Sequence, residues 1–77
     1  MVAFLREERR ISVHRALRRL KPDYRQVLWL VYFDDLTHRE AAAVMKKSVH
    51  ATETLVYRAR HALKAELERE GFDYEEL

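Results

Sequence analysis

Apolar positions recur every three or four residues along most of the chain, the spacing of a helix with one buried face. Between Val27 and Phe33 the run is wholly apolar, so the helix there should be buried on more than one side or also offer a face to a partner. One Gly and one Pro leave little turn chemistry for a sheet, so the fold class predicted is all-α. The pattern predicts four helices and a tail, over residues 3–20, 22–33, 38–45, 49–70 and 71–77.

Two residues mark helix boundaries. Pro22 suits the first turn of the second helix and disfavours continuation of the first helix through Lys21. Gly71 is the residue expected just past the end of the fourth helix.

The third and fourth helices predict a helix-turn-helix without a wing. Thr37 is a favoured N-cap and Glu40 follows three residues later, so the pair can form a capping box. Ser48 can cap the fourth helix. Only Lys46 and Lys47 separate the third helix from that cap, which leaves room for no more than a tight turn. This motif most often places its second helix in the DNA major groove.

The chain of 77 residues is predicted to form one small domain, residues 1–77, of modest stability. It has no Cys, so disulfides and thiolate metal sites are excluded, as is usual in the cytoplasm. No apolar run approaches the roughly 20 residues of a membrane span, and the first residues lack a signal-peptide layout. A cytoplasmic protein without a membrane partner is expected.

The net charge of +2 is unevenly distributed. Residues 1–65 contain 14 Lys and Arg and 7 Asp and Glu. Residues 66–77 contain 1 Arg and 6 Asp and Glu. Such charges can simply be a solvated helical surface. Because the basic part contains the helix-turn-helix, a surface that faces phosphates is the preferred interpretation.

The outward side of the fourth helix carries candidate DNA contacts. If the apolar stripe points inward, the outward side near the helix start consists of Ser48, His50, Ala51, Glu53, Thr54, Tyr57, Arg58 and His61. Recognition helices present such positions to base edges. Thr54 could bond a base, and Glu53 could accept a hydrogen bond from a cytosine amino group. Tyr57 and Arg58 suit phosphates or a flanking base. Each residue alone could equally be an ordinary exposed helix position.

His38 and Arg39 begin the third helix, where free N–H groups and a basic side chain could hold a phosphate. The alternative is that Arg39 forms an ion pair with Asp35.

No metal, cofactor or catalytic activity is expected. His50 and His61 lie three turns apart on their helix, and no carboxylate or thiol completes a ligand set. The sequence has no Cys, no Ser at the spacing from a helical His that a nucleophile and its base need, and no Gly-rich phosphate loop. Glutamates 66, 68 and 70 are interpreted as helix-end charges without a sign of burial.

The order of these motifs resembles the C-terminal domain, or fourth conserved region, of bacterial extracytoplasmic-function sigma factors. The resemblance covers about residues 13–68. It rests on the segments Ala16–Pro22, Tyr24–Val27, Leu36–Ala42, Ser48 and Arg58–Leu63, which stand at the family's spacing. No single segment is specific for this family, but the occurrence of all of them in this order is.

The resemblance implies that the fourth helix binds the −35 element of double-stranded promoter DNA. By position, the family's base-reading residues correspond to Glu53, Thr54, Tyr57 and Arg58, and its phosphate contacts to residues 38 and 39. The family also docks on the flap of the RNA polymerase β subunit, through an apolar groove between its first two helices. That groove would involve Leu17, Leu20, Val27, Leu28 and Val31. Part of this set should be exposed in the isolated domain, where it could bind an anti-sigma factor or drive weak self-association.

The chain departs from the family pattern at three places. Lys46 stands where a Gly is usual, and a left-handed backbone there would cost about 1 kcal/mol. Glu53 and Leu55 stand where basic residues are frequent, which leaves the promoter sequence open. The family's other half, which melts the −10 element, is not in this sequence, so the chain corresponds to one domain of a sigma factor or to a stand-alone relative.

Two other functions fit the same motifs. A protein-interaction module of this fold could dock on polymerase or a regulator and use Glu53 and Leu55 in contacts other than DNA. The DNA-binding domain of a response regulator is the other alternative, although its recognition helix is usually shorter. Retention of flap binding with weak DNA affinity would favour the interaction module.

Overall fold

The computed structural model describes residues 11–71, and all regular structure in that range is helical. Its helices cover residues 11–18, α2 (Pro22–Leu28), the π-helical turn η1 (Trp29–Phe33), α3 (His38–Met45) and α4 (Val49–Arg69). The predicted all-α fold with a helix-turn-helix is confirmed. The predicted helical residues 3–10 and tail residues 72–77 lie outside the described range.

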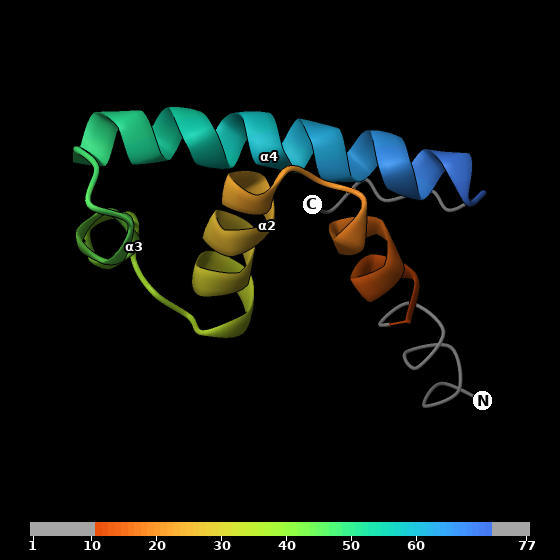
Figure 1. Cartoon of the computed structure of the whole chain (residues 1–77), viewed down its shortest axis with the longest axis horizontal. Helices are drawn as coiled ribbons and strands as arrows, with labels where there is room; N and C mark the ends of the chain where they lie inside the picture. Colours follow the sequence, from red (N-terminus) through yellow and green to blue (C-terminus); the bar gives the residue numbers. More distant parts are fainter. Residues whose placement is uncertain (1–10, 72–77) are drawn as a thin grey trace.

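The long helix α4 organises the rest of the domain. The other helices lie along one side of α4, with α3 near its start, α2 at its middle and the helix 11–18 toward its end (Figure 1). Both α2 and α3 contact α4 directly. The core that these helices enclose consists of Ala16, Leu17, Leu20, Val27, Leu28, Leu55, Val56, Ala59, Leu63 and Leu67. The apolar stripe predicted for α4 is therefore its buried face.

The second helix extends over the predicted residues but widens in its last turn. The N–H of Asp34 donates to the carbonyl of Trp29 at 3.1 Å, a bond across five residues that defines a π-helical turn. Val27 and Leu28 are buried in the core, whereas Trp29 and Phe33 are exposed. Of the two alternatives expected for this helix, the structure fits a core element with a further exposed apolar face rather than burial on all sides.

The turn between α3 and α4 is closed by a Lys in a left-handed conformation. Lys46 has φ 56° and ψ 46°, as its position in the motif predicted. Its N–H donates to the carbonyl of Ala43 at 3.3 Å, and the N–H of Lys47 donates to that of Ala42 at 3.0 Å. This pair of bonds is the Schellman motif, which Gly usually closes. A second non-Gly residue, Asp35, has φ 58° and was not anticipated.

The helix 11–18 is joined to the end of α4 by ion pairs. Arg15 contacts Glu70 at 3.3 Å, and Arg19 contacts Glu70 at 3.0 Å and Glu66 at 3.7 Å. The side chains of Glu66 and Glu70 are only 17% and 12% exposed. These two glutamates are helix-end charges as interpreted, but the expectation that they show no burial is wrong, because Arg15 and Arg19 contact them and both are mostly covered.

Within residues 11–71, no helix is both long and apolar enough to cross a membrane. The same residues contain no group of three side chains suited to holding a metal ion.

Candidate nucleic-acid interface

The first turn of α4 is fixed by Ser48 and Thr52. The hydroxyl of Ser48 accepts from the N–H of Ala51 at 3.0 Å, which confirms the predicted cap. The hydroxyl of Thr52 donates to the Ser48 carbonyl at 2.9 Å, and Thr52 is fully buried. These bonds satisfy backbone groups at the helix start and hold its outward side in a defined orientation.

The predicted contact residues of α4 share that outward side. All of them are exposed except Thr54, which is partly covered: Ser48, His50, Ala51, Glu53, Tyr57, Arg58 and His61. Tyr57 is 65% exposed, and its ring lies 4.4 Å from that of His61. The helix therefore presents hydrogen-bonding, aromatic and charged groups in one row.

A hollow beside this row contains residues that the sequence did not single out. It is lined by Asp23, Lys47, Ala51, Thr54, Leu55 and Arg58. From the sequence, Lys47 was assigned only to the turn, and Leu55 was noted as an apolar residue at a position where the family often has a basic one. Asp23 comes from the start of α2, so its place here depends on how α2 packs on α4, which no local sequence signal reveals. The hollow combines two cations with one carboxylate.

The start of α3 lies exposed on the same helix-turn-helix. The Thr37 hydroxyl accepts from the N–H of Glu40 at 3.1 Å, and the Glu40 carboxylate accepts from the N–H of Thr37 at 2.9 Å. This confirms the predicted capping box. His38 and Arg39 are exposed, and among the described residues no ion pair joins Arg39 to Asp35. The ion-pair alternative is therefore not realised among the described residues, and the phosphate clamp stays a prediction.

The apolar set expected for partner binding is mostly inside the domain. Leu17, Leu20, Val27 and Leu28 are at most 8% exposed, and Val31 is partly buried. The expectation that this set offers an exposed groove is therefore wrong for its first four members. These four side chains belong to the core that the helix 11–18, α2 and α4 enclose.

An exposed aromatic cluster lies at the outer end of the same helices. The rings of Trp29 and Phe33 stack at 4.5 Å, and His14 lies 5.7 Å and 5.5 Å from them. Trp29 and Phe33 are 41% and 44% exposed. Trp29 and Leu30 also line a hollow together with Pro22, Arg25 and Gln26. We call Trp29, Phe33 and His14 the aromatic cluster.

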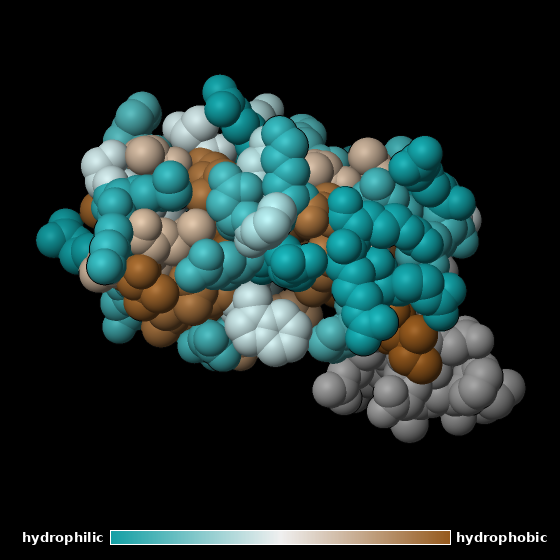
Figure 2. All heavy atoms as spheres, in the orientation of Figure 1, coloured by the Kyte–Doolittle hydropathy of each residue, from teal (hydrophilic) through white to brown (hydrophobic). Residues whose placement is uncertain are grey.

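Other apolar surface is scattered. Figure 2 shows hydrophobic atoms over α3 and the link before it, within a surface that is otherwise mainly hydrophilic. Val44 of α3 is 51% exposed. This surface lacks the stacked rings of the aromatic cluster.

The domain is a helix-turn-helix, a class of DNA-binding fold. It has a capped α3, a tight turn with a left-handed residue, and an α4 whose N-terminal side is exposed. The sequence matches the family described as sigma-70, region 4, over residues 10–63, and the chain belongs to this family of DNA-binding domains of transcription initiation. The chain is similar to the RNA polymerase sigma-H factor of Pseudomonas aeruginosa, with 33% identity over 66 residues. That match covers 86% of this chain and 34% of the relative, so the chain spans about a third of that protein's length. The family is one of transcription-factor domains rather than of enzymes.

Proposed function

We propose that this domain reads the −35 element of promoter DNA with the start of α4. The observation that supports this most directly is the row of exposed polar side chains on the first turns of a capped helix. Recognition helices of this class place such a row against base edges in the major groove. The domain would then supply sequence recognition during transcription initiation.

The proposed contacts divide into base-reading and phosphate-holding residues. Glu53 and Thr54 face the groove, where a carboxylate can accept from a cytosine amino group. Arg58 lies one turn further and can bond guanine or a phosphate. Lys47 and Arg39 flank the groove and hold phosphates on its two sides.

Arg58→Ala tests this assignment. We expect binding to selected duplexes to weaken by about 1–3 kcal/mol with relaxed preference at one base pair, if Arg58 reads a base. If it holds a phosphate, affinity falls evenly across sequences and the salt slope decreases by about one. Arg18→Ala, an exposed arginine on the helix 11–18, is the matched control. An unchanged affinity and salt slope would remove Arg58 from the interface.

We also propose that the domain docks on the β flap of RNA polymerase through the aromatic cluster. Leu17, Leu20, Val27 and Leu28 then form the buried support of the docking surface rather than the surface itself. Exposed stacked rings are typical of protein-binding sites, where aromatic side chains contribute large contact areas. An anti-sigma factor or a second copy of the chain would compete for the same rings.

Selection of bound sequences from random duplexes, with and without a β-flap fragment, tests both surfaces. A selected consensus that sharpens in the presence of the fragment is the expected result. Phe33→Glu should abolish the effect of the fragment and leave the consensus unchanged. A Leu20→Glu variant would not serve this purpose, because Leu20 is buried and its replacement by Glu would unfold the domain. Flap binding without any consensus would support the interaction module instead.

A further inference from the structure

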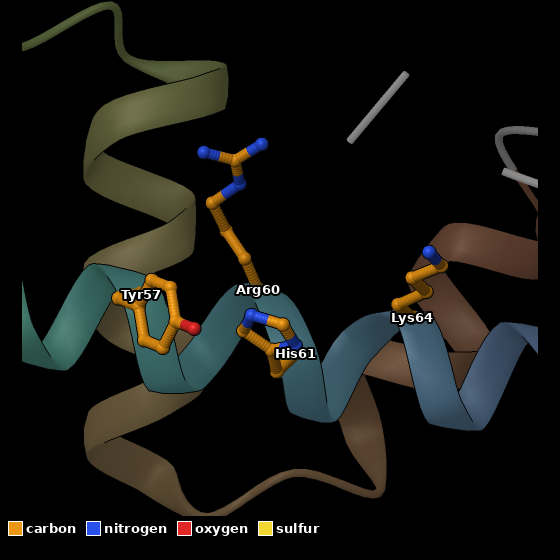
Figure 3. A pocket seen from close by; sticks show the side chains of 4 residues that line it. All are labelled: Tyr57, Arg60, His61 and Lys64. Atoms are coloured by element: carbon orange, nitrogen blue, oxygen red, sulfur yellow. The ribbon is translucent and has the colours of Figure 1, made fainter. Parts of the chain in front are cut away.

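A second basic surface lies on α4 beyond the residues proposed to read bases. Tyr57, Arg60, His61 and Lys64 line a hollow of about 220 Å³. Figure 3 shows the four side chains on successive turns of α4, with Arg60 and Lys64 extending toward the same side. Two of the four residues, Arg60 and Lys64, lie outside the set derived from the sequence.

The chemistry of this hollow suits an anion. Arg60 and Lys64 are both exposed and stand four residues apart, so their charges lie on neighbouring turns. Tyr57 and His61 add a hydroxyl and an imidazole, and their rings contact each other at 4.4 Å. None of the four lining residues is a carboxylate. Arginine and lysine side chains with hydroxyl groups are the usual partners of phosphate oxygens.

The length of α4 places this surface at the edge of the groove. At 1.5 Å per residue, the stretch from Val49 to Tyr57 is about 12 Å long, which is close to the width of the major groove. Arg60 and Lys64 lie about 16 and 22 Å from Val49 along the axis. Because α4 continues past the groove without a break, these residues meet the phosphate rim if the helix crosses the groove obliquely.

We propose that the hollow of Tyr57, Arg60, His61 and Lys64 binds phosphate groups of the DNA backbone that flanks the element read by the start of α4. The inference rests on the proposed DNA-reading function and extends it to a named set of phosphates. An acidic protein surface is the other anion that could fit. DNA is favoured because Tyr57 and His61 belong to the outward row of the reading face as well, so the two surfaces are continuous.

The test pairs Lys64→Gln with duplexes in which single flanking phosphates are replaced by neutral methylphosphonates. On native duplex, the variant should lose about 5–10-fold in affinity at 0.1 M salt, and its salt slope should fall by about 0.9. At one or two flanking positions, neutralising the phosphate should lower the DNA affinity of the wild type but leave the affinity of the variant unchanged. Arg18→Gln removes one positive charge from the helix 11–18 and should show no such coupling to any phosphate.

The outcomes separate this inference from the proposed function. The inference alone would be overturned if the wild type selects a promoter sequence but neutralising each phosphate lowers the DNA affinity of Lys64→Gln as much as that of the wild type. A variant that binds DNA like the wild type but fails to bind polymerase or another acidic protein would overturn it in favour of a protein contact. A wild type with no sequence preference would overturn both.

Discussion

Lys46 carries a backbone conformation that residues with a Cβ adopt at a cost of about 1–2 kcal/mol. Its φ of 56° closes the turn between α3 and α4, where the Schellman bonds leave no alternative geometry. The same turn positions Lys47 beside the reading face. The domain therefore accepts local strain at the point that sets the angle between the two helices.

Lys46→Gly should stabilise the domain by about 0.5–1 kcal/mol. Gly adopts positive φ without strain, and part of the gain is offset because the unfolded chain becomes more flexible. Urea unfolding measures the change in the free energy of unfolding. Lys47→Gly is the control, because Lys47 is not among the described residues with positive φ, and it should be neutral or destabilising. Equal effects at the two positions would contradict the strain argument.

Glu53→Arg should tighten binding to all DNA and change the preferred base near that position. The substitution replaces a repelled carboxylate by a cation on the exposed reading face, so the salt slope should increase. Titrations of a selected and a random duplex at several salt concentrations measure both effects. Weaker binding at every salt concentration would mean that Glu53 does not face DNA, which would strengthen the interaction-module alternative.

At the scale of the elements, the two caps define the helix-turn-helix. Thr37 and Ser48 each accept a backbone N–H bond, so α3 and α4 begin at fixed residues. The free N–H groups at each helix start carry the positive end of a helix dipole, which would add to the attraction of nearby basic side chains for an anion.

Thr37→Ala should lower the free energy of unfolding by about 1 kcal/mol, because it removes the hydroxyl of the capping box. Thr37→Ser keeps that hydroxyl and should stay close to the wild type. Thermal unfolding of the two variants provides the comparison. If Ala and Ser behaved alike, the cap would contribute nothing to stability.

Local signals in the sequence predicted the helix-turn-helix, and long-range contacts account for what they missed. The caps depend on neighbouring residues alone, so the motif predicted them correctly. The left-handed Lys46 followed from the family pattern as a condition, and the structure meets that condition. The π-helical turn and the positive φ of Asp35 arise where the chain leaves α2, and no residue there signals them. Glu70 looked solvated because its arginine partners lie more than 50 residues away.

The candidate site was predicted in part for the same reason. The exposed row on α4 follows from the periodicity of one helix, which the sequence contains. The burial of Leu20 and Val27 depends on how closely three helices pack against one another, which cannot be derived from local sequence patterns. The hollow that Arg60 and Lys64 line with Tyr57 and His61 depends on side-chain placement, which the periodicity of the helix does not reveal.

For the molecule as a whole, α4 joins the exposed polar row at its start to the helix 11–18. Arg15 and Arg19 reach Glu70 from that helix, so ion pairs anchor it at the end of α4 that is remote from α3. Two glutamates of the acidic end, Glu66 and Glu70, are thus paired with arginines from the other end of the described chain.

Glu70→Gln should lower the free energy of unfolding by about 0.5–1 kcal/mol, and less at high salt. The carboxylate contacts two arginines and is mostly covered, whereas Arg15 and Arg19 remain about half exposed. Glu68→Gln removes the same charge from an exposed neighbouring position and is the matched control. Urea unfolding at low and high salt should separate the two variants, and equal losses would show that the ion pairs add no stability.

The aromatic cluster also gives the molecule an optical label. Trp29 is the only tryptophan of the chain, and it is stacked on Phe33 in η1, away from the first turn of α4. Its emission should therefore shift when a β-flap helix covers the rings and stay constant when DNA binds α4. One unlabelled sample, titrated first with duplex and then with flap peptide, would report the two binding events separately. A shift with DNA alone would reveal that the two surfaces communicate through α2.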